Sequence, residues 1–430
     1  MSEYIGSEAI LEKKKKYIMP CLAHFYKKPR EFVKGEMQYL YDSEGRKYLD
    51  CFAGVSVINC GHCNPEISSK VAKQVQTLQH VCNIYLTENF VNLAERLAQV
   101  TPGDIQKTFF CSTGTEANEG SCLLAEIYTK SSEFIALRNG LHGRTKLTMS
   151  LTGIGMWRKD PNPVGGINFA PNAYCYRCPL GKKYPECDLA CANEIETIIK
   201  TATSGHPAAF IAEPIQGNAG IVVPPKGYFK RVMEILKQHG TLFIADEVQT
   251  GFARTGKMFA IENWDVVPDI MSVAKALGNG APISAFMSTA KIADTYTQPG
   301  ASTLGGNPVS TTAGLAVLDY IEKHNLMKNA QERGKQLKSG LMELQKRHPV
   351  IGDVRGIGLM VGAEFVNPDK SPAPDVLDDV LEELKDRGFI IGKNGIGRNV
   401  MAFQPPLVIT EKDIDDVLNA LELVLEEKKY

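Results

Sequence analysis

The chain has 430 residues, 43% of them hydrophobic, and its 48 basic residues are balanced by 49 acidic ones. This length allows two or three domains with a large core, and the balanced charge gives no signature of binding to nucleic acid or an anionic membrane. Because there is no signal peptide and no window near the roughly 18 apolar residues of a membrane span, we expect a cytoplasmic protein whose eleven cysteines are thiols or metal ligands.

The first part of the chain carries two short strand signals. The strings MQYLYD and KYLDC are separated by the turn Ser43-Glu44-Gly45, which predicts a small antiparallel ribbon. The basic run Lys13 to Lys16 is read as a solvated helix face. We place this N-terminal segment at residues 1–62 and a large domain at residues 63–321.

Apolar runs of four to six residues alternate with segments of helical period through the large domain. This pattern predicts an α/β fold with a mostly parallel central sheet and helices on both faces. The candidate strands are residues 108–111, 134–137, 208–212, 242–245 and 270–274.

A polar cluster follows each of these candidate strands. In chain order the clusters are STGTEAN, RNGLHGRT, EPIQG, DEVQTGF and finally Lys275. Ligands of open α/β sheets bind beyond the carboxyl ends of the strands. The five clusters therefore predict one shared site.

From about Glu322 the sequence changes character. The helical segment KNAQERGKQLKSGLMELQKR is followed by the strand-like GIGLMVGAEF, and a last helix begins after Thr410. We read residues 322–430 as a smaller α+β domain.

Lys275 and Asp246 each end a short apolar run. A lysine and a carboxylate are costly to desolvate unless they face a charged ligand. Pyridoxal phosphate answers both charges, because it needs a lysine for its Schiff base and an acid for its ring nitrogen. The pair therefore predicts a pyridoxal phosphate site.

Thr113-Gly114-Thr115 stands where a strand turns into a helical segment. A helix amino terminus binds anions through free N–H groups, and a glycine lets the backbone approach a phosphate. The alternative is an ordinary helix cap. The presence of Lys275 and Asp246 favours the phosphate.

The ordered strings SxGTEAN, HGRT, EPIQG, ADEVQTGFxRTG, AKALGNGxP and STLGGNPV, followed by RGIGLM and PPLVIT, resemble those of class III aminotransferases from about Tyr41 onward. The length and the cysteine-bearing insertion resemble the alanine–glyoxylate and β-amino acid branch. The resemblance implies pyridoxal phosphate fold type I and a homodimer, possibly paired into a tetramer, with active sites at the subunit interface.

The resemblance also implies roles for individual residues. Lys275 forms the Schiff base and Asp246 binds the pyridine nitrogen, while Val248 packs on the ring and Gln249 reaches its phenolic oxygen. Gly114 and Thr115 hold the phosphate with Thr303 of the other subunit. The remaining positions are Thr113, Leu141, His142 and Glu213 around the cofactor, and Val55, Arg144 and Glu213 around the substrate.

Two departures from the family bear on the substrate. Leu141 replaces the usual stacking aromatic residue, and Ala402 replaces an arginine that binds a carboxylate in relatives acting on ornithine or glutamate. In relatives a glutamate at the position of Glu213 can pair with an arginine and switch it between substrates, and Ala402 puts that switch in doubt here. Arg144 then becomes the best specificity residue, and Arg398 or Lys393 could supply charge from a shifted geometry.

These features predict a ping-pong transaminase that moves an amino group from an ω-amino acid to a 2-oxo acid. The donors considered are β-alanine, 3-aminoisobutyrate, γ-aminobutyrate and taurine, and the acceptors are pyruvate, glyoxylate and 2-oxoglutarate. An amino acid racemase or epimerase with the same lysine and cofactor is the alternative that Leu141 keeps open.

A remote alternative is a non-catalytic assembly protein that binds metal. Its basis is the C-x2-C-x8-C-x3-C spacing of Cys175, Cys178, Cys187 and Cys191, which suits a closed zinc or iron–sulfur site. Buried or exposed free thiols explain the same residues. We therefore assign no metal ligands to the predicted active site.

Overall fold

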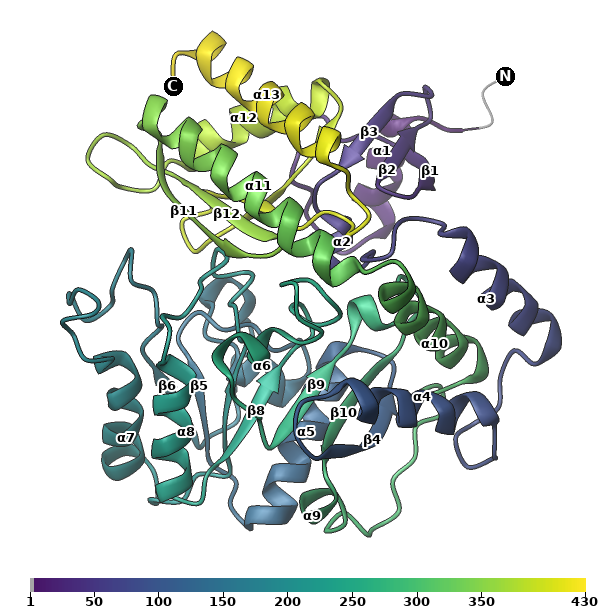
Figure 1. The fold of residues 1–430 in the computed structure, drawn as a ribbon, viewed down its shortest axis with the longest axis vertical. Coiled ribbons are helices and arrows are strands. Elements are labelled where there is room, and N and C mark those ends of the chain that lie inside the picture. The colour runs from purple at the N-terminus through teal and green to yellow at the C-terminus, as the bar shows by residue number, and fades with distance from the viewer. Residues whose placement is uncertain (1–3) are drawn as a thin grey trace.

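The computed structural model describes residues 4–430 and is organised around a seven-stranded sheet of order β4-β10-β9-β8-β7-β5-β6 (Figure 1). The pairs from β9 to β6 are all parallel, and β10 is antiparallel to both of its neighbours. This confirms the predicted fold class. The strands are β4 (Ile105–Cys111), β5 (Phe134–Leu137), β6 (Ile167–Ala170), β7 (Ala209–Ala212), β8 (Leu242–Asp246), β9 (Ile270–Val273) and β10 (Ser284–Thr289).

Alternate residues of the central strands enter two separate apolar clusters. Phe210 and Phe243 pack into one cluster, whereas their neighbours Ile211 and Ile244 pack into the other. Since successive side chains of a strand point to opposite faces, the sheet is buried on both sides. This burial explains why the strands read as continuous apolar runs.

Helices pack against the central sheet and cover its faces. Helix α5 lies against β9 and β10, while α7 packs against β6 and α8 against β8. The helices of this part and of the N-terminal part are α1 (Ser7–Tyr17), α2 (Ala53–Ser56), α3 (Pro65–Thr77), α4 (Glu88–Val100), α5 (Gly114–Thr129), α6 (Lys146–Leu151), α7 (Ala190–Ala202), α8 (Tyr228–Gln238), α9 (Ala290–Ala293) and α10 (Pro308–Lys323).

The predicted N-terminal ribbon is present and is extended by a strand from the far end of the chain. Strands β2 (Tyr39–Asp42) and β3 (Lys47–Asp50) are antiparallel, β1 (Phe32–Glu36) pairs with β2, and β13 (Phe389–Ile390) joins β3 in parallel. The N-terminal segment and the C-terminal region thus share one sheet. The proposed boundaries at residues 62 and 321 stay predictions.

The C-terminal region has its own four-stranded sheet, of order β11-β12-β15-β14. The last helix begins where the sequence predicts, because the Thr410 hydroxyl accepts the Asp413 N–H at 3.2 Å and caps it. The elements are α11 (Leu326–Arg347), β11 (Ile351–Ile357), β12 (Met360–Phe365), α12 (Pro374–Asp386), β14 (Gly392–Asn394), β15 (Val400–Phe403) and α13 (Glu411–Lys428).

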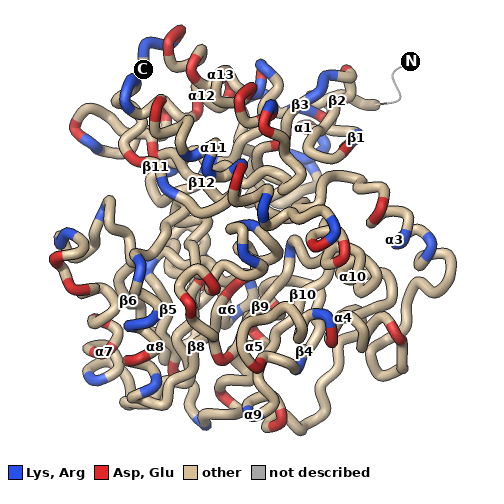
Figure 2. Tube along the Cα trace, in the orientation of Figure 1, with Lys and Arg blue, Asp and Glu red and all other residues tan. Residues whose placement is uncertain are grey.

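The C-terminal region and the N-terminal ribbon lie together above one edge of the central sheet (Figure 1). Acidic and basic residues are interspersed along the whole trace (Figure 2). Among residues 4–430, no helix combines the length and the apolar character needed to cross a membrane.

Candidate active site

A cavity of about 650 Å³ lies at the carboxyl ends of the central strands. It is lined by segments that follow β4, β5, β7, β8 and β9, together with α2 and the loop after β14. All the predicted site residues border it except Thr303, which is exposed elsewhere on the surface: Val55, Thr113, Gly114, Thr115, Leu141, His142, Arg144, Glu213, Asp246, Val248, Gln249 and Lys275. The five predicted clusters therefore line one cavity.

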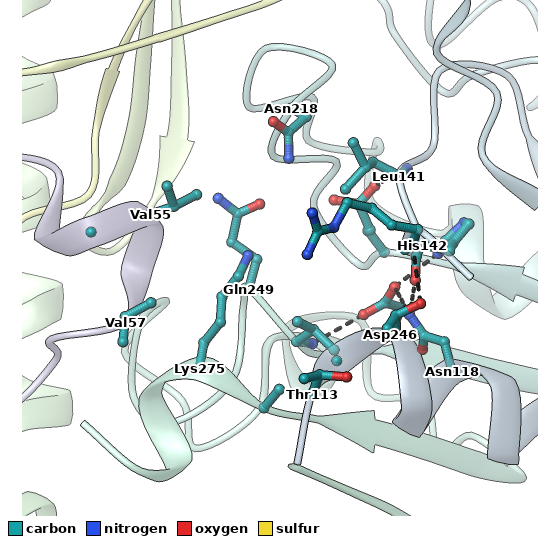
Figure 3. Close-up of a pocket in the computed structure, with 18 of the residues that line it drawn as sticks. Val55, Val57, Thr113, Asn118, Leu141, His142, Asn218, Asp246, Gln249 and Lys275 are labelled. Atoms are coloured by element: carbon teal, nitrogen blue, oxygen red, sulfur yellow. Dashed lines mark hydrogen bonds and ion pairs between the residues drawn. The ribbon is translucent and has the colours of Figure 1, made fainter. Parts of the chain in front are cut away.

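Asp246, the last residue of β8, is buried and held by three donors. Its Oδ2 accepts hydrogen bonds from Asn118 Nδ2 and His142 Nδ1, both at 2.8 Å, and its Oδ1 accepts the Val248 N–H at 3.1 Å. Figure 3 shows Asp246, His142 and Asn118 on one side of the cavity and Lys275 with Gln249 on the other. The carboxylate therefore faces the cavity in one fixed orientation.

Asn118 is a site residue that the sequence analysis did not assign. Its Nδ2 also donates to the His142 carbonyl at 2.7 Å, and its Oδ1 accepts the Ser272 hydroxyl. The available signal was its place four residues after Gly114, one turn along the helix that opens at the site. Asn118 thus joins Asp246 to the loop after β5.

Lys275 lies two residues after the end of β9 and is half-buried, with a left-handed φ of 47°. This conformation is unusual for a residue with a side chain and is a form of strain found at functional sites. Burial lowers the pKa of the Lys275 amine, and the nearby Asp246 and Glu213 carboxylates oppose that shift. A lowered pKa increases the fraction of free amine, the form that can attack a carbonyl or accept a proton.

Glu213 is buried after β7 and connects two loops of the cavity. Its Oε1 accepts the Leu141 N–H at 2.9 Å and its Oε2 accepts the Gly217 N–H at 3.0 Å. Burial raises the pKa of Glu213 to about 7. Both of its oxygens therefore accept backbone N–H groups, and the carboxylate holds the loops after β5 and β7 in place.

Ala402, at the position where relatives carry an arginine, lies in the interior of the C-terminal region. Ala402 is fully buried in β15, where it pairs with Gly362 and Gly392. Within residues 4–430, Glu213 forms no ion pair with an arginine. The role of Glu213 toward the substrate stays a prediction.

Two glycines bring the ring-binding candidates close to the backbone. A Cβ on Gly217 would lie 1.8 Å from Gln249 Oε1, and one on Gly114 would lie 2.9 Å from Val248 Cγ1. Gln249 also donates to Gln404 Oε1 at 3.3 Å, a contact that the sequence analysis did not foresee. A side chain at Gly217 would displace the Gln249 amide, and one at Gly114 would displace Val248.

The Thr113 to Thr115 segment combines the two interpretations of its sequence. Thr113 caps α5, with its hydroxyl 3.4 Å from the Glu116 N–H and its own N–H bonded to Glu116 Oε2 at 2.7 Å. The Thr115 hydroxyl lies 2.7 Å from that of Thr148 and accepts the Thr145 N–H at 3.1 Å. The first-turn N–H groups of α5 are therefore the donors best suited to an anion.

The outer end of the cavity is more open. Leu141 and Val55 are half-buried, Arg144 is exposed, and the aromatic rings of Phe25 and Trp157 border the same space. Val55 has a left-handed φ of 68° on α2. Phe25 and Trp157 were not predicted, because neither lies in a segment that follows a central strand.

The four cysteines of the insertion border a second cavity, of about 20 Å³. Within the described part of the chain, no group of three or more His, Cys, Asp or Glu side chains is placed to hold a metal ion. Burial, with smaller contributions from Cys175 and Cys187, raises the pKa of the Cys191 thiol to about 11.

Comparison with known proteins identifies the family. The family described as aminotransferase class-III matches residues 23–425. The chain therefore belongs to the class III aminotransferases, pyridoxal-phosphate-dependent enzymes, and its α/β architecture is their fold type I.

Three relatives illustrate the range of this similarity. The chain is 42% identical to "Alanine--glyoxylate aminotransferase 2 homolog 2, mitochondrial" of Arabidopsis thaliana, over 97% of this chain and 87% of that protein. It is 38% identical to a "Leucine/methionine racemase" of Thermococcus litoralis, over 96% and 94%. An (S)-enantioselective omega-transaminase structure from Thermomicrobium roseum matches with a TM-score of 0.91 and 29% identity, over 99% of each chain.

Proposed function

We propose that the protein is a transaminase that moves an amino group from an ω-amino acid to a 2-oxo acid in a ping-pong reaction. The donors in question are β-alanine, 3-aminoisobutyrate, γ-aminobutyrate or taurine, and the acceptors are pyruvate, glyoxylate or 2-oxoglutarate. The observation that carries the proposal is the pairing of Lys275 with the fixed Asp246 carboxylate across one cavity. The similarity to the alanine–glyoxylate aminotransferase and the omega-transaminase supports it.

The residues around the cavity fit pyridoxal phosphate. Asp246 would bind the ring nitrogen, Val248 and Leu141 would pack near the ring, Gln249 would reach the phenolic oxygen, and the N–H groups of the α5 amino terminus would hold the phosphate. When bound, the cofactor supplies an electron sink for the electron pair released as the substrate Cα–H bond breaks.

Lys275 and Asp246 have separate proton tasks in this proposal. With its lowered pKa, the Lys275 Nζ can take the proton from the substrate Cα and return it as a general acid. Asp246, fixed by Asn118, His142 and the Val248 N–H, would favour a proton on the ring nitrogen of the bound cofactor. The carboxylate thus has an electrostatic role and the amine a proton-transfer role.

Arg144 is proposed to contact an acidic part of the substrate, since it borders the cavity and has no ion pair within residues 4–430.

Thr303 is proposed to act in the site of a second subunit. Its neighbour Leu304 is 58% exposed and Leu86 is fully exposed, which supports a covered apolar surface between two copies. Light scattering of the purified protein tests for a dimer or tetramer.

The experiment that tests the function is an absorbance spectrum of the purified protein with β-alanine, γ-aminobutyrate, taurine and L-alanine added singly, without an oxo acid. Conversion of the lysine-bound cofactor band to the band of the amino form with one ω-amino acid supports the proposal and identifies the donor. An unchanged band with every ω-amino acid contradicts it.

A second candidate function is racemisation of an amino acid. The 38% identity to the leucine/methionine racemase and the aliphatic Leu141 favour it. A racemase would exchange the Cα hydrogen of an α-amino acid with solvent deuterium while the cofactor band persists. Mass spectrometry after incubation in deuterated buffer separates the two functions.

We further propose that the protein works in the cytoplasm. The Arabidopsis relative carries "mitochondrial" in its name, so the compartment needs a direct test. Fractionation of cells that make the native protein provides it.

A further inference from the structure

Besides Lys275, three cationic side chains border the main cavity: Arg144, Lys393 and Arg398. The donor and the acceptor of the proposed reaction both carry an acidic group. The question is therefore which of the three cations is available to bind it.

Lys393 is not available, because its charge is already paired. It is a buried residue of β14, and its Nζ forms an ion pair with Asp378 of α12. The same Nζ lies 3.5 Å from the Pro374 carbonyl. Separating a buried ion pair is costly, so Lys393 remains committed to Asp378.

Arg398 lies in the loop between β14 and β15 and has unused donors. Its Nη1 donates to the Lys393 carbonyl at 3.0 Å, whereas a guanidinium has five N–H donors. The structure gives it no carboxylate partner within residues 4–430. The carboxylate that acts on it electrostatically is Asp378, which Lys393 already binds.

The surroundings of Arg398 hold the guanidinium in place. Its central carbon is 5.4 Å from the centre of the Phe25 ring, a cation–π distance. Its backbone is in the left-handed region, with φ 54°, and its N–H bonds to the Gly395 carbonyl at 3.0 Å. Backbone strain at a cavity wall is typical of functional positions.

The Arg398 loop is also joined to the cofactor end of the cavity. The Gly395 N–H bonds to the Asn218 carbonyl at 3.0 Å, and Asn394 Nδ2 bonds to the Gly217 carbonyl at 3.0 Å. Gly217 in turn bonds to Glu213 and packs against Gln249. The loop is therefore positioned by the same backbone that positions the proposed ring-binding residues.

Burial distinguishes Arg398 from Arg144. Arg398 is half-buried and desolvation lowers the pKa of its guanidinium, while Arg144 is exposed. Ionic contacts are screened less in a partly buried position than at an exposed one. A carboxylate therefore gains more from Arg398.

We infer that Arg398 binds the substrate carboxylate through paired N–H···O contacts, at the end of the cavity bordered by Phe25. The ligand class is a small carboxylate, the acidic group of the amino donor or of the 2-oxo acid. This inference rests on the proposed function, since it assumes that the amino group reacts at Lys275. It makes Arg398 a substrate-binding residue in addition to Arg144.

The test uses propionate, a carboxylate without an amine, and a matched amine pair, β-alanine and n-propylamine. Arg398→Met is compared with wild-type holoenzyme and with Arg387→Met, an exposed arginine that is paired with Glu427. Loss of a charge-assisted contact of about 1.5–3 kcal/mol predicts propionate binding about 10- to 100-fold weaker in Arg398→Met. Arg387→Met should leave it unchanged.

The amine pair adds a kinetic measurement. The Michaelis constant for β-alanine should rise by about the same factor in Arg398→Met, whereas that for n-propylamine should change less than about twofold. Arg398→Lys should recover part of the affinity, since it restores charge without the two-pronged geometry. Unchanged propionate binding in a folded Arg398→Met would overturn the inference, and so would an effect found in Arg144→Met instead.

The two proposals fail in different ways. If neither amine changes the cofactor band of the wild type while Arg398→Met still loses propionate, the carboxylate site stands and the transaminase function fails. If the band responds to β-alanine equally in wild type and Arg398→Met, the function stands and Arg398 is removed from the site.

Discussion

The two ends of the cavity are built differently. At the inner end, Asp246 and Glu213 are buried and together accept five hydrogen bonds. At the outer end, Arg144 is exposed, and Arg398 makes one side-chain hydrogen bond and one ring contact. The carboxylates proposed to act with every substrate are fixed by several hydrogen bonds. The arginines proposed to select a substrate have N–H donors without a partner in the described residues.

This contrast predicts how substitutions behave. Changes at the inner end should lower the rate with every substrate, because they alter groups that the common chemistry uses. Changes at the outer end should alter the Michaelis constant for some substrates only.

The largest effect is expected for Lys275→Ala. Removing the amine removes both the covalent attachment of the cofactor and the proposed proton carrier, so turnover should fall by at least about 10³-fold with every donor. The visible band of the lysine-bound cofactor should disappear. Lys257→Ala, at an exposed lysine, is the matched control. Substantial turnover by Lys275→Ala would break the assignment of the inner end.

Asp246→Asn should have the next largest effect. The substitution keeps the shape but removes the charge that holds a proton on the ring nitrogen, so kcat should fall about 100-fold, the equivalent of one charge-assisted contact. The loss should be similar for β-alanine and n-propylamine, because the residue acts on the ring. Asp265→Asn, at an exposed aspartate, controls for the change of charge. A loss confined to one amine would contradict the proposed role.

The inner end was also easier to predict from sequence than the outer end. Strand ends carry their polar residues with them, so Asp246, Glu213 and Lys275 follow from the positions of β8, β7 and β9. Phe25 meets Arg398 only through tertiary packing, since 373 residues separate them in the chain. No local pattern reports such a contact.

Similar limits apply to the sheet and to the phosphate segment. Strand β10 was not predicted because SAFMST mixes small and polar residues, and these are buried through the packing of β4, β9 and α5 around the strand. The sequence predicted Thr115 at the site, and the residue borders the cavity, but the engagement of its hydroxyl with Thr148 depends on where α6 lies. The pairing of β3 with β13 is equally non-local.

An effect of intermediate size is expected for substitution of the buried carboxyl groups of Glu213 and Glu247. Burial raises the pKa of both to about 7, but Glu247 bonds to the Ile261 N–H at 2.8 Å and does not border the cavity. A carboxyl whose folded pKa is raised contributes stability that is complete below its unfolded pKa, near 4.5, and is lost as pH rises through 7. Between those values the cost is about 1.4 kcal/mol per pH unit for each group.

Glu213→Gln and Glu247→Gln should therefore each reduce the loss of stability between pH 5 and 8, measured by denaturant unfolding at fixed cofactor concentration. Only Glu213→Gln should also change the pH dependence of the reaction with β-alanine, because only Glu213 positions the cavity loops. If Glu247→Gln changes the kinetic profile as much, the separation between site and scaffold carboxyls is wrong.

The smallest effect is expected for Leu141→Tyr, in the loop after β5 that borders the cavity. The Leu141 N–H is held by Glu213 at 2.9 Å, so the substitution changes the side chain while the backbone stays fixed. An aromatic ring that stacks on the cofactor should add about 0.5–1.5 kcal/mol, which tightens cofactor binding roughly 2- to 10-fold. Leu141→Met keeps the volume without a ring and should leave the dissociation constant nearly unchanged. Weaker cofactor binding by Leu141→Tyr would show that the cavity has no room for a ring. A higher ratio of transamination to deuterium exchange in that variant would show that Leu141 sets the balance between the two candidate reactions.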